Sequence, residues 1–423
     1  MSDAITPMTR IPPLAFFAGK RILMLQGPVG PFFRRLAADL KALGADVKKV
    51  NFNGGDWIYH PDAAITYTGT LDDWAGFLNE LLLSWKPDVI FLYNDTRPVH
   101  DMAIQLAQLH AIDVFTFEEG YVRPDFITLE RGRANGHSAM MQRQSLKLLS
   151  DVDVLAKREC KVGYSFLHLA WRGFWYHAWA WLLMPLMPGH TYHRGLGGRE
   201  LIPQVRSYWR KLCYHSAGRA LQKRLSGDLS RKFFLVPLQV SVDSQIVHHS
   251  KYAKGGVPAF MREVTSSFAR HAPQDTHLVF KHHPMDRGYT AYFDVIDELR
   301  REFPNLRERL HYVFDINLPL ALDNAAGVVV INSTVGLSAI MHGTAVKVHG
   351  GRAIYDLEGL TAQIPLDDFW QNSWRHRPDT DLAQRFRSFL IHTCQINGNF
   401  YRRLPHMHLR CGLNWPEAWQ WKT

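Results

Sequence analysis

Short apolar runs alternate with helix-like patterns over the first third of the chain. Apolar runs predict buried strands, and apolar positions that recur every three or four residues predict helices. Strands are therefore expected at 21–26, 46–51, 88–93 and 112–117, and helices at 31–43, 71–85 and 99–110. Because strands that alternate with helices are typical of right-handed βαβ units, we expect a parallel sheet here.

The same alternation returns in the second half of the chain. Strands are expected at 233–237, 277–281, 310–314, 327–331 and 345–349, with helices at 258–271, 291–302, 318–324 and 335–342. The pattern predicts an α/β protein with two Rossmann-like domains. Ligands of open α/β sheets bind outside the carboxyl ends of the strands, so residues that directly follow a strand are the candidates for chemistry.

The segment between the two halves differs from both of them. Residues 164–187 are rich in Trp, Tyr and Phe, and the basic stretch Arg194–Lys232 follows. Three interpretations remain open: an aromatic core helix that bridges the domains, a helix that docks on a membrane surface, or a membrane span, for which histidines and prolines make it a poor candidate. The expected segments are 1–160, a helical insert at 161–230, 231–375, and a C-terminal helical segment at 376–423.

Composition and charge restrict the class of protein. The chain has 423 residues, 46% of them hydrophobic, and a formal net charge of +10, which favours an anionic partner. No nucleic-acid recognition motif is present, so nucleic acid is not expected among the partners. Four cysteines without CxxC spacing argue against a disulfide framework and a structural zinc site. The residues 1–13 lack the apolar run of a secretory signal, so a cytoplasmic location is expected.

Two motifs of the first half follow predicted strands. Gln26 and Gly27 open a Gly- and Pro-rich turn before a helix, where free N–H groups suit an anion, although a tight turn without a ligand is the alternative. Glu118 and Glu119, with Arg123 nearby, end the fourth strand. Such a carboxylate pair suits a reaction centre, but it also suits a helix cap or ion pairs.

Three motifs of the second half also follow strands. Gln239 and Asp243 follow the first strand, and a carboxylate there can share acid/base and nucleophile duties with a second one. Lys281 and His283 suit phosphate binding, whereas metal binding by adjacent histidines is disfavoured because neighbours in an extended chain face opposite ways. Ser333 and Thr334 begin a helix and suit either an anion cradle or a plain N-cap.

These segments together resemble the KpsS/LipB-type Kdo transferases of the bacterial capsule polysaccharide synthesis family. The matching pieces occur in order along the chain: QGPVGPFF at Gln26–Phe33, NFNGGDWIY at Asn51–Tyr59, EEGYVRP at Glu118–Pro124, QVSVDS at Gln239–Ser244, KHHP at Lys281–Pro284 and NSTVGLSAI at Asn332–Ile340. The resemblance implies two Rossmann-like domains in a GT-B-like arrangement, with an acceptor domain first and a nucleotide-sugar domain second. It implies transfer of β-Kdo from CMP-Kdo, with retention, to lysophosphatidylglycerol at the cytoplasmic face of the inner membrane. A KpsC-type Kdo transferase and the capsule export machinery are the implied partners.

The resemblance also implies roles for single residues. CMP phosphate would bind to Lys281, His283 and Pro284 of the KxHP pattern, with further nucleotide contacts from Ser333, Thr334 and Gln239. Asp243 would be the nucleophile, and one carboxyl of the pair Glu118 and Glu119 would be the acid/base. Gln26 and Gly27, with Arg123, would lie on the acceptor side.

No metal or cofactor is expected, because lysine, histidine and a helix N-terminus can stabilise the departing phosphate. Two other functions remain open: a different GT-B-type sugar-nucleotide enzyme, since a fold does not fix a function, and a non-catalytic peripheral scaffold of the capsule export complex.

Overall fold

The computed structural model describes residues 11–62, 64–139, 159–187, 201–241, 246 and 250–416. By the density of their internal contacts these residues form two compact units. Unit 1 holds residues 11–139, 159–187 and 389–416, and unit 2 holds residues 202–388. The C-terminal part of the chain thus returns to the unit that contains the first part.

Unit 1 is built on a seven-stranded sheet with the order β12-β6-β5-β4-β1-β2-β3. Its strands are β1 (Arg21–Met24), β2 (Asp46–Asn51), β3 (Ala64–Thr66), β4 (Val89–Tyr93), β5 (Asp113–Glu119), β6 (Phe126–Arg131) and β12 (Gln395–Asn397). The strands β1 to β5 are parallel, as predicted, whereas β6 and β12 pair antiparallel at one edge. The sequence pattern did not predict β3, β6 or β12.

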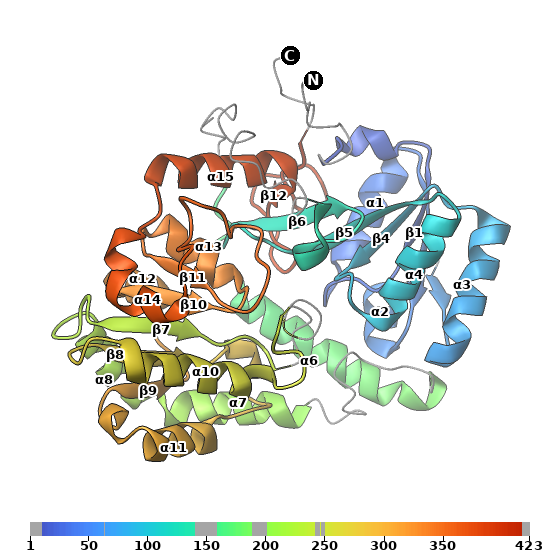
Figure 1. The fold of residues 1–423 in the computed structure, drawn as a ribbon. Helices are drawn as coiled ribbons and strands as arrows, with labels where there is room; N and C mark the ends of the chain where they lie inside the picture. Colours follow the sequence, from blue (N-terminus) through green and yellow to red (C-terminus); the bar gives the residue numbers. More distant parts are fainter. Residues whose placement is uncertain are drawn as a thin grey trace. The chain divides into compact units, whose positions relative to one another are not determined.

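Helices cover both faces of this sheet (Figure 1). The face-covering helices are α1 (Phe32–Ala42) on one side and α3 (Leu71–Trp85) with α4 (Pro98–Leu109) on the other, whereas α2 (Gly54–Tyr59) and α6 (Phe166–Leu182) pack against each other. Successive β1 residues point to opposite faces, so Ile22 packs in the core beneath α1 while Leu23 packs in the core beneath α3 and α4. This alternation makes the short apolar run of β1 a strand that is buried on both faces.

Unit 2 contains a parallel five-stranded sheet with the order β11-β10-β7-β8-β9. Its strands are β7 (Phe233–Pro237), β8 (His277–Lys281), β9 (Leu310–Val313), β10 (Gly327–Val330) and β11 (Val346–Val348). Its helices are α7 (Leu201–Cys213), α8 (His215–Leu225), α10 (Gly256–His271), α11 (Phe293–Glu302), α12 (Leu318–Asn324), α13 (Thr334–Met341) and α14 (Leu366–Asn372), and α15 (Thr380–Thr393) leads back to unit 1. Every strand predicted in this half is present.

The predicted fold class of two Rossmann-like α/β domains is confirmed by these two sheets and their covering helices. The aromatic and basic middle of the chain is helical, as expected, but its helices are divided. The aromatic α6 belongs to unit 1, whereas α7 (from Ile202 onwards) and α8 belong to unit 2. Within the described ranges, no helix combines the length and the apolar character needed to cross a membrane.

Candidate functional site

The carboxyl ends of three adjacent strands meet in unit 2. The strand β7 lies between β10 and β8, so the loops that follow these strands are neighbours. The Gln239 side chain donates a hydrogen bond from Nε2 to Oδ1 of Asn332 at 3.0 Å, and both side chains are buried. The structure therefore brings the predicted Gln239 next to the segment that precedes α13.

Lys281 is the last residue of β8, and its side chain is buried. Its one hydrogen bond in the described part of the chain is a long one, 3.4 Å from Nζ to the His282 carbonyl oxygen. The pKa of Lys281 is lowered to about 8, chiefly by burial and also by Arg287, while Asp315 opposes the shift. The ammonium group thus has N–H donors to spare for an anionic ligand.

The two histidines after Lys281 have different surroundings, as expected for neighbours in an extended segment. His282 is buried, and its Nδ1 lies 2.8 Å from the Tyr312 hydroxyl. His283 is partly exposed, and its Nδ1 accepts a hydrogen bond from the Met285 N–H at 3.2 Å. Pro284 is exposed and begins a single 3-10 turn. Over the ranges that the structure describes, no three His, Cys, Asp or Glu side chains are grouped as metal ligands would be.

Asp286 connects the loops after β7 and β8, and the sequence analysis missed it. Its carboxylate accepts hydrogen bonds from the backbone N–H of Ser241 at 3.0 Å, from the Ser241 hydroxyl at 3.2 Å and from the Thr290 hydroxyl at 2.6 Å. Asp286 is fully buried and fixes the turn that carries His283. Its sole sequence signal is its place two residues after the KHHP motif. Asp243, the predicted nucleophile, lies outside the described residues.

Ser333 is the N-cap of α13, and its hydroxyl accepts a hydrogen bond from the Val335 N–H at 3.3 Å. Thr334 is the first residue of the helix and is partly exposed. Gly336 is required here, because a Cβ atom at this position would lie 2.2 Å from the Tyr355 hydroxyl oxygen. Tyr355 in turn donates a hydrogen bond to the Ser333 carbonyl oxygen. The N-terminus of α13 is therefore held rigidly beside Asn332.

The predicted carboxylate pair of unit 1 forms the end of β5. Glu118 is 9% exposed, and its two oxygens accept hydrogen bonds from the Glu119 N–H at 3.0 Å and from Asn135 Nδ2 at 3.3 Å. The pKa of Glu118 is raised to about 8, chiefly by burial and also by the Glu119 and Asp95 charges, while the hydrogen bond from the Glu119 N–H and the Arg97 charge oppose the shift. The Glu118 carboxyl group is therefore mostly protonated at neutral pH.

Glu119 has different partners from Glu118. It is partly exposed, and its Oε1 accepts hydrogen bonds from the Tyr401 hydroxyl at 3.0 Å and from the Tyr93 hydroxyl at 3.4 Å. Arg123 is exposed, and its Nε donates to the Gly120 carbonyl oxygen at 3.1 Å. Arg123 thus stabilises the turn after β5 and forms no ion pair with either carboxylate.

Gln26 is the centre of a buried hydrogen-bond network in unit 1. Its Oε1 accepts from Arg97 NH1 at 2.6 Å, and its Nε2 donates to Asp56 Oδ2 at 3.2 Å and to the Tyr176 hydroxyl at 3.0 Å. The Tyr176 hydroxyl also accepts from Asn53 Nδ2 at 2.8 Å and donates to Asp56 Oδ1 at 3.1 Å. The sequence analysis missed the three partners of Gln26 and also Asn53, although Asn53 and Asp56 lie in its NFNGGDWIY motif.

The glycines of that motif permit the network to form. A Cβ atom on Gly54 would lie 2.4 Å from the Trp179 carbonyl oxygen, and one on Gly55 would lie 2.6 Å from that of Tyr176. The helices α2 and α6 can therefore pack in direct backbone contact, which places the Tyr176 hydroxyl within reach of Asp56.

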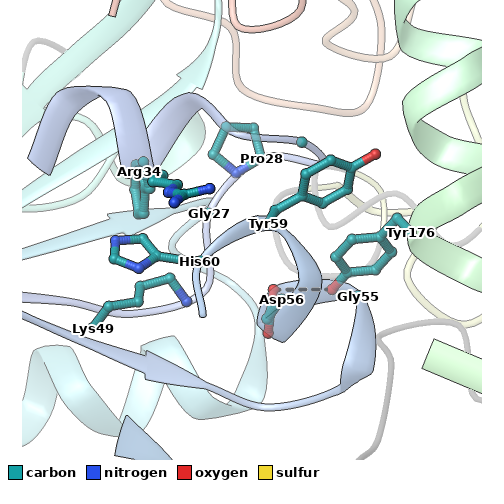
Figure 2. Close-up of a pocket in the computed structure, with 11 residues that line it drawn as sticks. Gly27, Pro28, Arg34, Lys49, Gly55, Asp56, Tyr59, His60 and Tyr176 are labelled. Atoms are coloured by element: carbon teal, nitrogen blue, oxygen red, sulfur yellow. Dashed lines mark hydrogen bonds between the residues drawn. The ribbon is translucent and has the colours of Figure 1, made fainter. Parts of the chain in front are cut away.

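A pocket with about 260 Å³ of space between its walls, part of it open to solvent, adjoins this network. Gly27, Pro28 and Gly30 line it from the turn after β1, and Tyr176 lines it from α6. In the view of Figure 2, Arg34, His60 and Lys49 lie on one side of the pocket, and Tyr59 and Tyr176 lie on the other. The structure thus places the predicted Gly27 in the wall of a pocket that also contains two cationic side chains, and the predicted Gln26 in the network beside it.

Comparisons with known proteins agree with the resemblance. Residues 88–401 match the family described as capsule polysaccharide biosynthesis protein. The chain is 38% identical over 387 residues to the capsule polysaccharide export protein KpsS of Escherichia coli, covering 91% of this chain and 97% of that protein. It is also 38% identical over 395 residues to the capsule polysaccharide modification protein LipB of Neisseria meningitidis serogroup B, covering 92% of this chain and 93% of that protein.

Solved structures align over most of the chain, but with low similarity. A glycosyltransferase of Rickettsia africae aligns with a TM-score of 0.35 and 10% identity, over 88% of this chain and 93% of that one. The UDP-GlcNAc 2-epimerase of Neisseria meningitidis aligns with a TM-score of 0.32 and 11% identity, over 88% of this chain and 98% of that one. Such values support no conclusion about activity. The family match and the two relatives show that this chain is a KpsS/LipB-type member of the capsule polysaccharide biosynthesis family.

Proposed function

We propose that this protein is a retaining β-Kdo transferase that moves Kdo from CMP-Kdo to lysophosphatidylglycerol and so begins the linker of a capsular polysaccharide. Family membership supports a role in capsule synthesis, and the motif resemblance supports the donor and the acceptor. The observation that carries the proposal is the cluster of Lys281, Gln239, Asn332 and the α13 N-terminus at three adjacent strand ends. This is where an open α/β sheet binds a nucleotide.

Donor binding requires groups that stabilise negative charge on the CMP phosphate as the sugar departs. The Lys281 ammonium supplies a buried positive charge, and His283, with Ser333 and Thr334, supplies hydrogen bonds close by. A charge in a buried site interacts more strongly with an anion than a charge in water does. The GT-B-like placement of the two units, which would bring donor and acceptor together, remains a prediction.

Retention requires two displacements at the same anomeric carbon. In the first, an Asp243 carboxylate oxygen attacks that carbon, and the bond from the carbon to the CMP oxygen breaks. In the second, the acceptor hydroxyl oxygen attacks, its proton passes to a base, and the bond to Asp243 breaks. The base would be one carboxyl of the pair Glu118 and Glu119. Because burial raises the pKa of Glu118 to about 8, Glu118 could accept a proton only in the minor fraction that is ionised at neutral pH. The role of Asp243 rests on the motif resemblance alone.

A lipid acceptor requires the enzyme to reach a membrane surface. The helix α6 has two unlike faces. Gly173, Tyr176 and His177 are buried, whereas Leu167, Trp171 and Trp181 are 65%, 64% and 55% exposed. Exposed Trp side chains are suited to the headgroup region of a bilayer. This arrangement supports peripheral docking of unit 1 on the cytoplasmic face of the inner membrane.

The test is a transfer assay with the purified full-length protein, CMP-Kdo and lysophosphatidylglycerol, followed by mass spectrometry of the lipid. One Kdo added to the lipid is the expected product, and no product is expected with UDP-sugars. Consumption of a UDP-sugar in place of CMP-Kdo would identify a different sugar-nucleotide enzyme. No consumption of any donor would favour the scaffold function.

Two variants examine the residue roles in the same assay. Asp243→Asn should reduce turnover by at least ~10³, because an amide is a poor nucleophile, and should abolish any Kdo-protein adduct seen with donor alone. Asp323→Asn, on α12 at the surface of unit 2, is the matched control and should retain activity. Near-normal transfer by Asp243→Asn would show that another group is the nucleophile.

A further inference from the structure

The pocket beside Gln26 contains a buried histidine whose ring nitrogens have no hydrogen-bond partner. His60 is 6% exposed, and neither Nδ1 nor Nε2 has a partner of acceptable geometry in the described part of the chain. The pKa of His60 is lowered to about 4, chiefly by burial and also by Lys49, while nearby backbone carbonyls oppose the shift. Buried polar groups are nearly always hydrogen-bonded. A neutral imidazole without such partners therefore indicates that a ligand binds here and accepts a hydrogen bond from the imidazole N–H.

Cationic groups lie beside His60. Lys49 is 3% exposed, and its Nζ donates to the Val50 carbonyl oxygen at 2.7 Å and to Asn51 Oδ1 at 3.1 Å, which leaves one of its three N–H groups. Arg34, from α1, also lines the pocket. The two carboxylates nearest to these cations are already engaged, since Asp56 accepts hydrogen bonds within the Gln26 network and Asp62 pairs with Arg34.

The turn after β1 adds backbone donors to this wall. The helix α1 has 11 residues, and its N-cap, Pro31, provides no side-chain hydrogen bond to the first turn. The preceding glycines, Gly27 and Gly30, line the pocket. A helix N-terminus with uncapped N–H groups attracts an anion. This wall of the pocket thus offers many hydrogen-bond donors and few acceptors. The donors are the imidazole of His60, the ammonium of Lys49, the guanidinium of Arg34 and the N-terminus of α1, and such a set fits a phosphate.

We propose that this pocket binds a phosphate group, with His60, Lys49 and the N-terminus of α1 as its donors, and that the phosphate belongs to the headgroup of the lipid acceptor. The second part rests on the proposed function. It is supported by α6, which contributes Tyr176 to the pocket and at the same time exposes Leu167 and Trp171 on its other face. The same helix thus contributes to the pocket for the phosphate and carries the exposed apolar side chains that would contact the acyl chain.

The experiment measures ligand binding by full-length protein variants with isothermal titration calorimetry. The probes are inorganic phosphate, glycerol 3-phosphate, lysophosphatidylglycerol in neutral detergent micelles, and monoacylglycerol, which has the acyl chain without the phosphate. His60→Phe removes the ring donors and retains the ring volume, and Lys49→Met removes the ammonium. The controls lie outside the pocket. His110→Phe changes a partly exposed histidine of unit 1 that bonds to Asn79, and Lys48→Met changes the neighbour of Lys49, the Nζ of Lys48 lying 4.7 Å from the Trp85 ring centroid.

We expect both pocket variants to bind glycerol 3-phosphate and lysophosphatidylglycerol at least tenfold more weakly than the wild type, and both controls to remain within twofold of it. Circular dichroism tests whether each variant is folded. If Lys49→Met is unfolded, the result is decided by His60→Phe alone. Unchanged binding of glycerol 3-phosphate by folded His60→Phe would overturn the phosphate site. Equal affinity for inorganic phosphate and lysophosphatidylglycerol would overturn the assignment to a lipid headgroup.

The outcome is separable from that of the proposed function. If the wild type does not transfer Kdo but His60→Phe still loses lysophosphatidylglycerol binding, the proposed activity fails and the phosphate site stands. If the wild type transfers Kdo and His60→Phe has an unchanged KM for the acceptor, the activity stands and the phosphate site fails.

Discussion

The Tyr176 hydroxyl donates a hydrogen bond to Oδ1 of Asp56 at 3.1 Å, and this contact joins α6 to the predicted acceptor side of unit 1. Two further side chains, Gln26 and Asn53, donate to the same hydroxyl oxygen. One hydroxyl group therefore uses its single donor and both of its acceptor sites. The exposed aromatic face of α6 and the polar pocket are thereby parts of one rigid arrangement.

Tyr176→Phe should destabilise the protein by about 1–3 kcal/mol, since it leaves buried donors and an acceptor without their partner. The measurement is urea unfolding, read as a lower midpoint at an unchanged slope. Tyr164→Phe is the control, because Tyr164 is 65% exposed, and it should have little effect. An unaltered midpoint for Tyr176→Phe would mean that water replaces the hydroxyl without cost.

Lys281→Met should weaken CMP binding by about 1.5–3 kcal/mol, the range for a hydrogen bond that involves a charged group. Calorimetric titration with CMP measures this loss. Lys347→Met is the matched control: Lys347 is a partly buried lysine of β11 in the same sheet, and its Nζ donates to the Ala362 carbonyl oxygen at 3.3 Å. Equal CMP affinities for Lys281→Met and the wild type would remove Lys281 from the nucleotide site.

The contribution of Lys281 should also depend on pH. Burial lowers the pKa of Lys281 in the free protein to about 8, and a bound phosphate favours the charged form and so raises that pKa. The difference in CMP affinity between the wild type and Lys281→Met should be constant up to about pH 7.5 and should then decline up to pH 9. Because the titration of CMP itself affects both proteins equally, it cancels when the binding free energy of the variant is subtracted from that of the wild type. A difference that grows with pH would contradict a protonated Lys281 as the phosphate ligand.

Glu118→Gln should change how stability depends on pH. Because burial raises the pKa of Glu118 to about 8, the folded protein retains a proton there that the unfolded chain releases near pH 4.5. Unfolding then releases a proton between these values, so the wild type should lose stability as the pH rises from 5 to 8. Over this pH range, the free energy of unfolding of Glu118→Gln should fall by about 1–3 kcal/mol less than that of the wild type. The exposed Glu80→Gln serves as the control and should follow the wild type.

Removal of exposed tryptophans from α6 should weaken membrane binding. The measurement is flotation with anionic vesicles. The double change Trp171→Ala and Trp181→Ala should lower the partition constant roughly tenfold, which corresponds to about 1.4 kcal/mol of binding free energy. Trp374→Ala is the control, since Trp374 in unit 2 is 62% exposed and lies far from α6 in the sequence. High salt should reduce the vesicle binding of the wild type, the double variant and the control alike, because salt screens the attraction to anionic lipids. Equal binding by the double variant and the control would exclude α6 as the docking face.

The local order of strands and helices in both units could be predicted from the sequence. A buried parallel strand must be apolar on both faces and a covering helix on one face, so β1 and α1, or β8 and α10, are visible as patterns in the chain. The antiparallel strands β6 and β12 were not predicted. They lie far apart along the chain, at Phe126–Arg131 and Gln395–Asn397, and their pairing is a long-range property.

The residue types at the strand ends were also determined by the sequence, and with them the candidates Lys281, Ser333 and Glu118. Only the tertiary structure decided which side chains meet. The order β10-β7-β8 places Gln239 beside Asn332, and backbone contact at Gly54 and Gly55 places Tyr176 at Gln26 across 150 residues of chain. Burial decided the rest. It raises the pKa of Glu118 and lowers that of Lys281, because the loss of solvation depends on what surrounds a group in space and not on its neighbours in sequence. It also leaves the ring nitrogens of His60 without a hydrogen-bond partner among the residues that the structure describes.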